Sequence, residues 1–302
     1  MITVKNSNFL YMLVLIIILV GETLLYIAFP NIPIHLFTTI IQFSFILLPA
    51  ILYLLFSKVS IKSSLRFNKL SGKSILISLI IGICSLPLVG AIGNLSELVF
   101  HNHIQDSVAE FPIMPLALWI GILSLTPSIC EEVFMRGVVL DGYKNVSLKK
   151  AALMNGFLFG MFHMNLNQFV YTFILGIILT YTVAITNSIF SSMIIHFAFN
   201  TPSAIASWAM QDSQEKLEPI KALSDYAPGE LAGFLVSNFI ILAIATFIVV
   251  RLIRALKKVN NYFPNTDIYT KKEKIFTVPI YVSIVIFLLI SVGISLLTNT
   301  PI

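Results

Sequence analysis

The chain has 302 residues, of which 57% are hydrophobic and only 11% carry a charge. This composition, together with a mean hydropathy of +0.93, excludes an ordinary soluble globular domain. The formal net charge of +5 comes from short basic loops between apolar segments, so it gives no support for binding to nucleic acid.

Nine apolar segments are each long enough, at roughly 18–25 residues, to cross a lipid bilayer, and the fifth is the shortest. We therefore predict an all-α fold: a polytopic membrane helix bundle with about nine (eight or nine) transmembrane helices, forming a single integral-membrane domain over residues 1–302. In chain order the predicted spans are approximately 9–29, 35–56, 74–100, 112–140, 151–166, 169–186, 188–208, 230–253 and 277–297.

Basic residues alternate with neutral or acidic loops along this series of spans. Lys and Arg gather in 57–73, 141–150 and 251–274, whereas the loops between these are neutral or acidic, as at Asp106 and in 209–229. Cytoplasmic loops carry the excess of Lys and Arg, so the pattern predicts a cytoplasmic N-terminus and an external C-terminus.

The fourth predicted span contains three charged residues, in the sequence Glu131-Glu132-Val-Phe-Met-Arg136. A charge at bilayer depth costs at least about 2.5–3.5 kcal/mol, so such residues usually pair or line a functional cavity. Glu132 and Arg136 are four residues apart, the favoured spacing for an ion pair on a helix. Glu131 is rotated from Glu132 by about 100° and is left available for chemistry. The alternative is a purely structural ion-pair cluster near the end of the helix.

Two further spans each carry a residue pair with the same spacing of four, and each pair includes a histidine. Phe159 precedes His163 by one helical turn and is expected to wall its imidazole from lipid, and His196 shares one face of a helix with Asn200. Each pair alone is compatible with a buried core histidine or with hydrogen bonding between helices. All three spans, however, present their polar residues at a similar predicted depth, which favours one buried polar pocket.

A carboxylate beside two imidazoles in a partly dry pocket can activate water for hydrolysis. A histidine and an asparagine amide can stabilise the developing oxyanion. Glu131, His163 and His196 could alternatively ligate a divalent metal such as Zn²⁺, and the spacing does not separate these two possibilities. The sequence contains neither a Gly-x-Ser-x-Gly elbow nor a His-Glu-x-x-His helix.

The order of these motifs resembles that of the CPBP (CAAX protease and bacteriocin-processing, Abi) intramembrane endopeptidases. The resemblance rests on Glu131-Glu132-x-x-x-Arg136, Phe159-x-x-x-His163 and His196-x-x-x-Asn200. It covers about residues 112–208, which it marks as the catalytic core, and Met135 stands where this family often has a Phe.

The resemblance implies catalytic roles for Glu131 and His163, which would activate water, and for His196 and Asn200, which would support the oxyanion. Glu132 and Arg136 would organise the first motif. Members are often labelled metalloproteases, although a metal-independent mechanism has also been argued, so either a divalent metal or no cofactor is compatible. The family also implies a peptide or lipidated-peptide substrate and a bacterial plasma membrane.

Three functions are therefore considered. The first is an endopeptidase that cleaves near the cytoplasmic half of the bilayer, and the second is a non-catalytic bacteriocin immunity protein that uses the same pocket. The third is a proton-coupled transporter, because buried Glu and His also relay protons. The absence of an inverted repeat counts against the transporter. The substrate, its prenylation and the oligomeric state are left open by the sequence.

Overall fold

The computed structural model describes residues 2–100, 111–210, 223, 226–263 and 273–297. All regular secondary structure in these ranges is helical, as the sequence predicted. The acidic loop residues Asp106, Asp212 and Asp225, on which part of the predicted orientation rests, lie outside the described residues.

Most predicted spans are continuous helices, but the second and fourth are each divided by π-helical turns, written η. The elements are α1 (Val4–Ala28), α2 (Ile34–Ile40), η1 (Ile41–Leu47), α3 (Leu48–Phe56), α4 (Ile61–Ser64), α5 (Gly72–Glu97), α7 (Leu116–Ile120), η2 (Gly121–Leu125), α8 (Thr126–Glu132), η3 (Val133–Val139), α9 (Leu148–Phe162), α10 (Leu166–Thr186), α11 (Ile189–Ala209), α12 (Pro228–Val259) and α13 (Val278–Leu297).

Each of the nine predicted segments coincides with helix, and seven of the described helical segments are long and apolar enough to cross a membrane. The last predicted span contributes a shorter apolar helix over Val278–Gly293. The fifth prediction, 151–166, was wrong in its C-terminal end, because α9 has only 15 residues and stops at Phe162. Met164 there has a left-handed backbone with φ of 50°, and the Asn165 side chain caps the start of α10.

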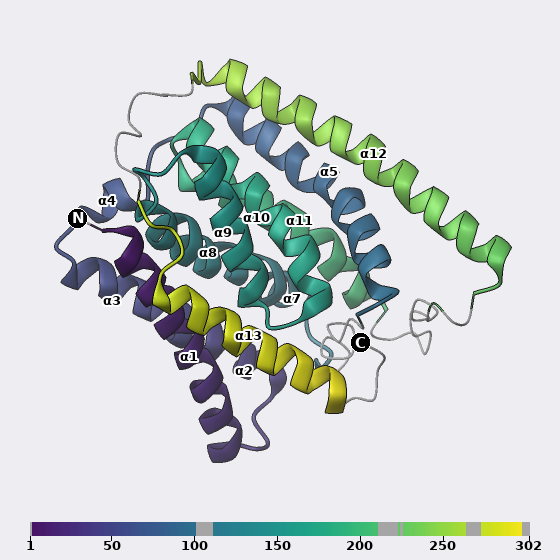
Figure 1. Ribbon diagram of the computed structural model, residues 1–302, viewed down its shortest axis with the longest axis horizontal. Coiled ribbons are helices and arrows are strands. Elements are labelled where there is room, and N and C mark those ends of the chain that lie inside the picture. Colours follow the sequence, from purple (N-terminus) through teal and green to yellow (C-terminus); the bar gives the residue numbers. More distant parts are fainter. Residues whose placement is uncertain (1, 101–110, 211–222, 224–225, 264–272, 298–302) are drawn as a thin grey trace.

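The bundle is centred on α10, which packs against α5, α9 and α11, and α5 also packs against α11 (Figure 1). Helix α12 lies along the outer side of α5, and α13 lies beside α1 on the opposite side of the bundle. The fourth span, from α7 to η3, contacts both α11 and the second span. This arrangement encloses the three predicted motifs, which lie in the fourth span, α9 and α11.

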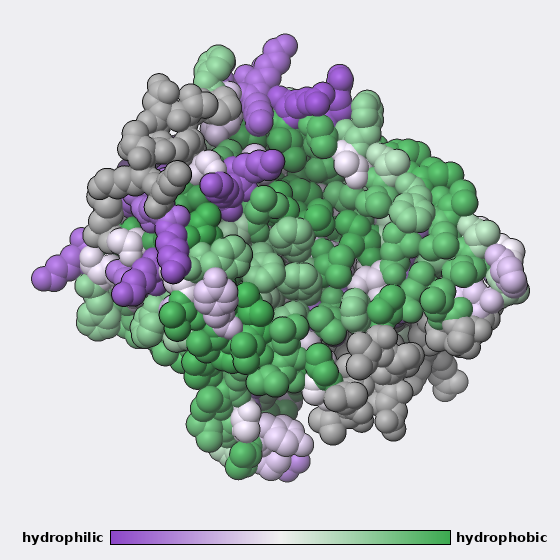
Figure 2. Space-filling model, in the orientation of Figure 1, coloured by the Kyte–Doolittle hydropathy of each residue, from purple (hydrophilic) through white to green (hydrophobic). Residues whose placement is uncertain are grey.

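Apolar side chains cover much of the outer surface (Figure 2). Large hydrophobic residues are strongly exposed on the peripheral helices, for example Phe247 on α12 at 65% and Leu289 on α13 at 69%. Such extensive exposure is unfavourable in water and is expected where helices face lipid. The chain is therefore an integral membrane protein.

The basic loops of the described chain meet at one end of the bundle. Hydrogen bonds join Asn68 to the carbonyl oxygen of Asn187, Ser74 to Asn260, and Asn145 to Glu273. Figure 2 shows hydrophilic side chains gathered at this end, near α4 and the C-terminal end of α12. This grouping is the one expected of loops that share a membrane side, and assignment of that side to the cytoplasm stays a prediction.

Two glycines allow α9 and α10 to approach closely behind the first motif. A Cβ atom added at Gly156 of α9 would lie 2.6 Å from the backbone oxygen of Phe173. One added at Gly176 of α10 would lie 2.7 Å from the Cα of Gly156 and 3.3 Å from Nη2 of Arg136. Small residues let membrane helices pack with their backbones in contact, and here that contact also seats Arg136.

The Gly156→Ala variant is expected to be less stable by about 1–3 kcal/mol, because the added methyl group meets backbone rather than a flexible side chain. Thermal unfolding of the purified protein in detergent would measure the loss. Gly90→Ala in α5 is the matched control, since a Cβ atom there meets nothing within 4 Å. Equal unfolding temperatures for the two variants would contradict the close approach described above.

Candidate active site

The first motif lies where the fourth span changes from α-helix to π-helix. Glu131 and Glu132 are the last residues of α8, and Arg136 lies in the middle of η3. Short π-helical turns are uncommon and occur frequently at functional sites. Two side chains from elsewhere in the chain bind the main chain of η3. Asn155 of α9 donates to the carbonyl oxygen of Met135 at 2.9 Å, and Arg66, in the loop after α4, donates to the carbonyl oxygen of Arg136 at 3.2 Å.

A buried ion network joins the first and third motifs. Oε1 of Glu132 accepts from Nη1 of Arg136 at 2.9 Å and lies 2.9 Å from Nδ1 of His196. Glu132 and Arg136 are fully buried, and Nη2 of Arg136 also reaches the carbonyl oxygen of Gly176 at 3.5 Å. The predicted Glu132–Arg136 pair is confirmed. Its extension to His196 was not predicted, and it fixes the orientation of that imidazole.

The ring of Phe159 is packed among the charged and imidazole groups of all three motifs. The Arg136 guanidinium carbon lies 4.2 Å from the centroid of this ring, within the range of a cation–π contact. The His163 and His196 rings contact it edge-to-face, with centroid distances of 5.2 and 5.9 Å. Phe159 is almost fully buried, so it supplies the apolar wall that the sequence predicted for His163 and extends it to His196.

Glu131 does not share the ion network, as its rotation from Glu132 predicted. Its Oε1 accepts a 2.9 Å hydrogen bond from Nε2 of Gln42 in η1, and its Oε2 has no hydrogen-bond partner among the described residues. Nε2 of His163 is likewise buried without a partner there. Glu131 lies close enough to His163 to interact with it electrostatically. Oε2 of Glu132, Nε of Arg136 and Oε1 of Gln42 are also buried without a partner among the described residues, so the cluster as a whole has unused hydrogen-bonding capacity. Glu131 and His163, which lie outside the Glu132–Arg136–His196 network, are the two expected to handle water.

Gln42 was missed by the sequence reasoning. The available signal was a single amide within the otherwise apolar predicted span 35–56, but nothing in the sequence indicated that η1 would face α8. Its hydrogen bond orients Glu131 and leaves Oε2 of that carboxylate free of intramolecular contacts.

If Glu131 is the catalytic base, Gln42→Leu is expected to lower kcat about tenfold with little change in KM, because an oriented carboxylate loses one hydrogen bond of roughly 1.5 kcal/mol. Steady-state cleavage of a peptide substrate would measure both constants. Ser44→Ala serves as the control, because Ser44 is exposed on the same helical turn. A Gln42→Leu variant with unchanged kcat would argue against a role in orienting Glu131.

Asn200 lies one turn beyond His196 on α11, but the two side chains have different partners. Its Nδ2 donates to the carbonyl oxygen of Leu123 in η2 at 3.4 Å. Asn200 therefore contacts η2 of the fourth span, whereas His196 contacts Glu132 at the end of α8. One N–H of the Asn200 amide stays available for a ligand.

Glu131, His163 and His196 are the residues predicted as possible ligands of a metal ion. Within the described residues, no three His, Cys, Asp or Glu side chains are grouped as they would be around a metal ion. Nδ1 of His196 is engaged by Glu132, which leaves Nε2 of that imidazole for any ligand. Glu131, His163 and His196 are therefore not grouped as a three-ligand metal site among the described residues.

The fold and the cluster together define a class: a helical membrane protein in which two carboxylates, two imidazoles and a guanidinium meet inside the bundle. Residues 113–202 match the family model described as type II CAAX prenyl endopeptidase Rce1-like. This match includes all three motifs and confirms the resemblance predicted from them. At the family level it points to a membrane protease of the CAAX type. Comparisons with curated proteins and with solved structures gave no match.

Proposed function

We propose that this protein is an intramembrane endopeptidase that hydrolyses a peptide bond with water activated by Glu131. The family match supports the general class, and the proposal adds the residues and their roles. The substrate is a peptide ending in a prenylated cysteine and three further residues, or a related membrane-associated peptide such as a bacteriocin precursor. The reaction takes place inside the bundle, on the side of the basic loops, which we assign to the cytoplasm.

The observation that carries the proposal is the unused hydrogen-bonding capacity of Glu131 and His163. Oε2 of Glu131 and Nε2 of His163 are both buried without a partner in the described part of the chain. Buried polar atoms are normally satisfied, so these two atoms call for a partner. A water molecule or a substrate carbonyl group between the two side chains would supply one.

The reaction follows from these groups. Glu131 takes a proton from water, and the hydroxide attacks the carbonyl carbon of the scissile peptide bond, giving a tetrahedral intermediate with a negative oxygen. The proton held by Glu131 then passes to the leaving nitrogen, directly or through His163, as the carbon–nitrogen bond breaks. One water is consumed, and a carboxylate and an amine are formed.

The ion network gives His196 a supporting role in this scheme. Oε1 of Glu132 lies 2.9 Å from Nδ1 of His196 and fixes the orientation of the ring, and Nε2–H is the proposed donor to the developing oxyanion. Arg136 balances the charge of Glu132 and keeps it in place. The free N–H of Asn200 is the second donor to the oxyanion.

Cleavage of a synthetic prenylated peptide by the purified protein tests the proposal. The reaction is run in ¹⁸O-labelled water and followed by mass spectrometry. It should release the last three residues as an unlabelled tripeptide and leave one labelled oxygen in the new carboxylate of the prenylated cysteine. The His163→Ala variant should lose most of this activity, whereas Gln168→Ala, a polar change near the start of α10, should retain it. No product from verified, folded protein on any prenylated or unprenylated peptide would favour the non-catalytic immunity function instead.

A further inference from the structure

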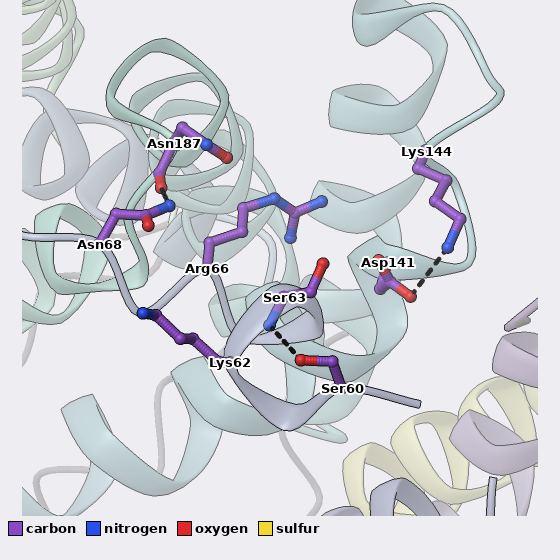
Figure 3. Close-up of a pocket in the computed structure, with 8 residues that line it drawn as sticks. All are labelled: Ser60, Lys62, Ser63, Arg66, Asn68, Asp141, Lys144 and Asn187. Carbon is purple, nitrogen blue, oxygen red and sulfur yellow. Dashed lines mark hydrogen bonds and ion pairs between the residues drawn. The ribbon is translucent and has the colours of Figure 1, made fainter. Parts of the chain in front are cut away.

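A second polar pocket lies at the basic end of the bundle, outside the candidate active site (Figure 3). Its volume is about 440 Å³, within the usual range for a small-ligand site. It is formed by α4, the loop that follows α4, the turn after η3, and the residue that joins α10 to α11. The lining residues are Ser60, Lys62, Ser63, Arg66, Asn68, Asp141, Lys144 and Asn187.

The lining carries more positive than negative charge. Lys62, Arg66 and Lys144 face a single acid, Asp141, which pairs with Lys144 at 3.3 Å and accepts from the Ser64 hydroxyl group at 3.5 Å. Among the described residues, neither Lys62 nor Arg66 has a carboxylate oxygen within 4.0 Å. The pocket therefore holds two cations that an anionic ligand could neutralise.

Arg66 is positioned for recognition of such a ligand. Its Nη1 donates to the carbonyl oxygens of Arg136 and Ser64, at 3.2 and 3.4 Å, and these bonds leave the rest of the guanidinium fork available. In Figure 3 this side chain extends between the Asn68–Asn187 pair and the Asp141–Lys144 pair. Burial lowers the pKa of Arg66 below its ordinary value, and Asp141 opposes this shift. A bound anion would raise the pKa of Arg66, as Asp141 does.

The wall around Arg66 is fixed by hydrogen bonds between segments far apart in the sequence. Asn68 donates to the carbonyl oxygen of Asn187 at 2.7 Å, and the Ser188 hydroxyl group donates to the carbonyl oxygen of Asn68 at 2.6 Å. These bonds hold the loop after α4 against the junction of α10 and α11. The pocket is thus formed before any ligand arrives, which reduces the entropic cost of binding.

Apolar side chains are exposed next to these polar residues. Phe56 at the end of α3 is 80% exposed, and Ile61 precedes Lys62 on α4. Phe67, adjacent to Arg66, stacks on Phe190 of α11 with a centroid distance of 5.6 Å, and both rings are partly exposed. The pocket therefore lies where the polar end of the bundle meets its apolar outer surface, the level at which lipid headgroups are found.

We propose that this pocket binds a phosphate group, with Arg66 as the bidentate ligand and Lys62 and Lys144 as additional positive charges. The planar guanidinium matches two phosphate oxygens, and the lysines act as point charges. The headgroup of an anionic phospholipid and a free phosphate anion share this chemistry. The adjacent exposed phenylalanines offer contacts to acyl chains, which only the lipid can use.

Binding measurements on the full-length protein in neutral detergent test the proposal. Native mass spectrometry would compare phosphatidylglycerol with phosphatidylcholine, whose phosphate is neutralised by its own ammonium group. Thermal unfolding with inorganic phosphate, against chloride at equal ionic strength, would test the free anion. The variants are Arg66→Gln and Lys62→Gln. The Lys62 amine makes no hydrogen bond among the described residues, so Lys62→Gln is expected to fold normally even if Arg66→Gln does not. Lys69→Gln is the matched control, an exposed basic residue of the same segment outside the pocket lining.

A lipid site predicts that phosphatidylglycerol binds more tightly than phosphatidylcholine, and that Lys62→Gln weakens this binding about fivefold while Lys69→Gln does not. A free-anion site predicts that phosphate raises the unfolding temperature of the wild-type and Lys69→Gln proteins but not that of Lys62→Gln. Equal binding by all variants, or equal weakening by Lys62→Gln and Lys69→Gln, would overturn the proposal. Neither outcome depends on peptidase activity.

Discussion

The Glu131→Gln variant is expected to lose peptidase activity, with kcat lowered by about 10²–10⁴ and KM nearly unchanged. The amide cannot accept the proton of the attacking water, whereas its oxygen can still accept the hydrogen bond from Gln42. The fold should therefore persist. Single-turnover cleavage of the prenylated peptide, with thermal unfolding of the same preparation, would separate lost chemistry from lost structure.

Glu22→Gln provides the matched control for this experiment. Glu22 is a partly buried glutamate of α1, and it does not belong to any of the three motifs. Its replacement removes one carboxylate from a membrane span and should leave kcat unchanged. If the Glu131→Gln protein cleaved the substrate at the wild-type rate, Glu131 could not be the base.

The Arg136→Met variant is expected to be severely destabilised, by about 3–5 kcal/mol, because it leaves the Glu132 carboxylate buried without its counter-ion. Arg136 also contacts the Phe159 ring and the carbonyl oxygen of Gly176, so its loss disturbs both α9 and α10. The measurement is the midpoint of unfolding in detergent, compared with the wild type under the same conditions.

The double variant Glu132→Gln with Arg136→Met isolates the buried charge. It removes both partners, so it should recover part of the stability lost in Arg136→Met. It should nevertheless stay inactive, because the His196 imidazole no longer has an anionic partner at Nδ1. An Arg136→Met protein as stable as the wild type would show that the ion pair contributes little to the fold.

The features that sequence reasoning predicted well depend on local spacing. Apolar length located the helical spans, and the interval of four residues between Glu132 and Arg136 predicted a pair that the structure contains. The same spacing placed Phe159 against His163. These relations hold within a single helix, so a sequence pattern is sufficient to state them.

The features that sequence reasoning missed depend on contacts between helices. The hydrogen bond from Gln42 to Glu131 joins residues 89 positions apart in the sequence, and His196 and Glu132, which are also in contact, are 64 positions apart. The early end of α9 at Phe162 depends on the left-handed residue Met164, which has no side-chain feature that signals such a backbone. Periodicity describes one helix at a time and carries no information about which helix faces another.

The π-helical turn η3 has a consequence for attempts to transplant the first motif. The carbonyl oxygens of Met135 and Arg136 are held by Asn155 and Arg66, which lie in two other parts of the chain. A segment copied alone into another membrane helix would lose both anchors, and ordinary α-helical winding would then turn Arg136 relative to Glu131. The Glu-Glu-x-x-x-Arg motif is therefore not a portable module, and a designer would have to carry over residues 66 and 155 as well.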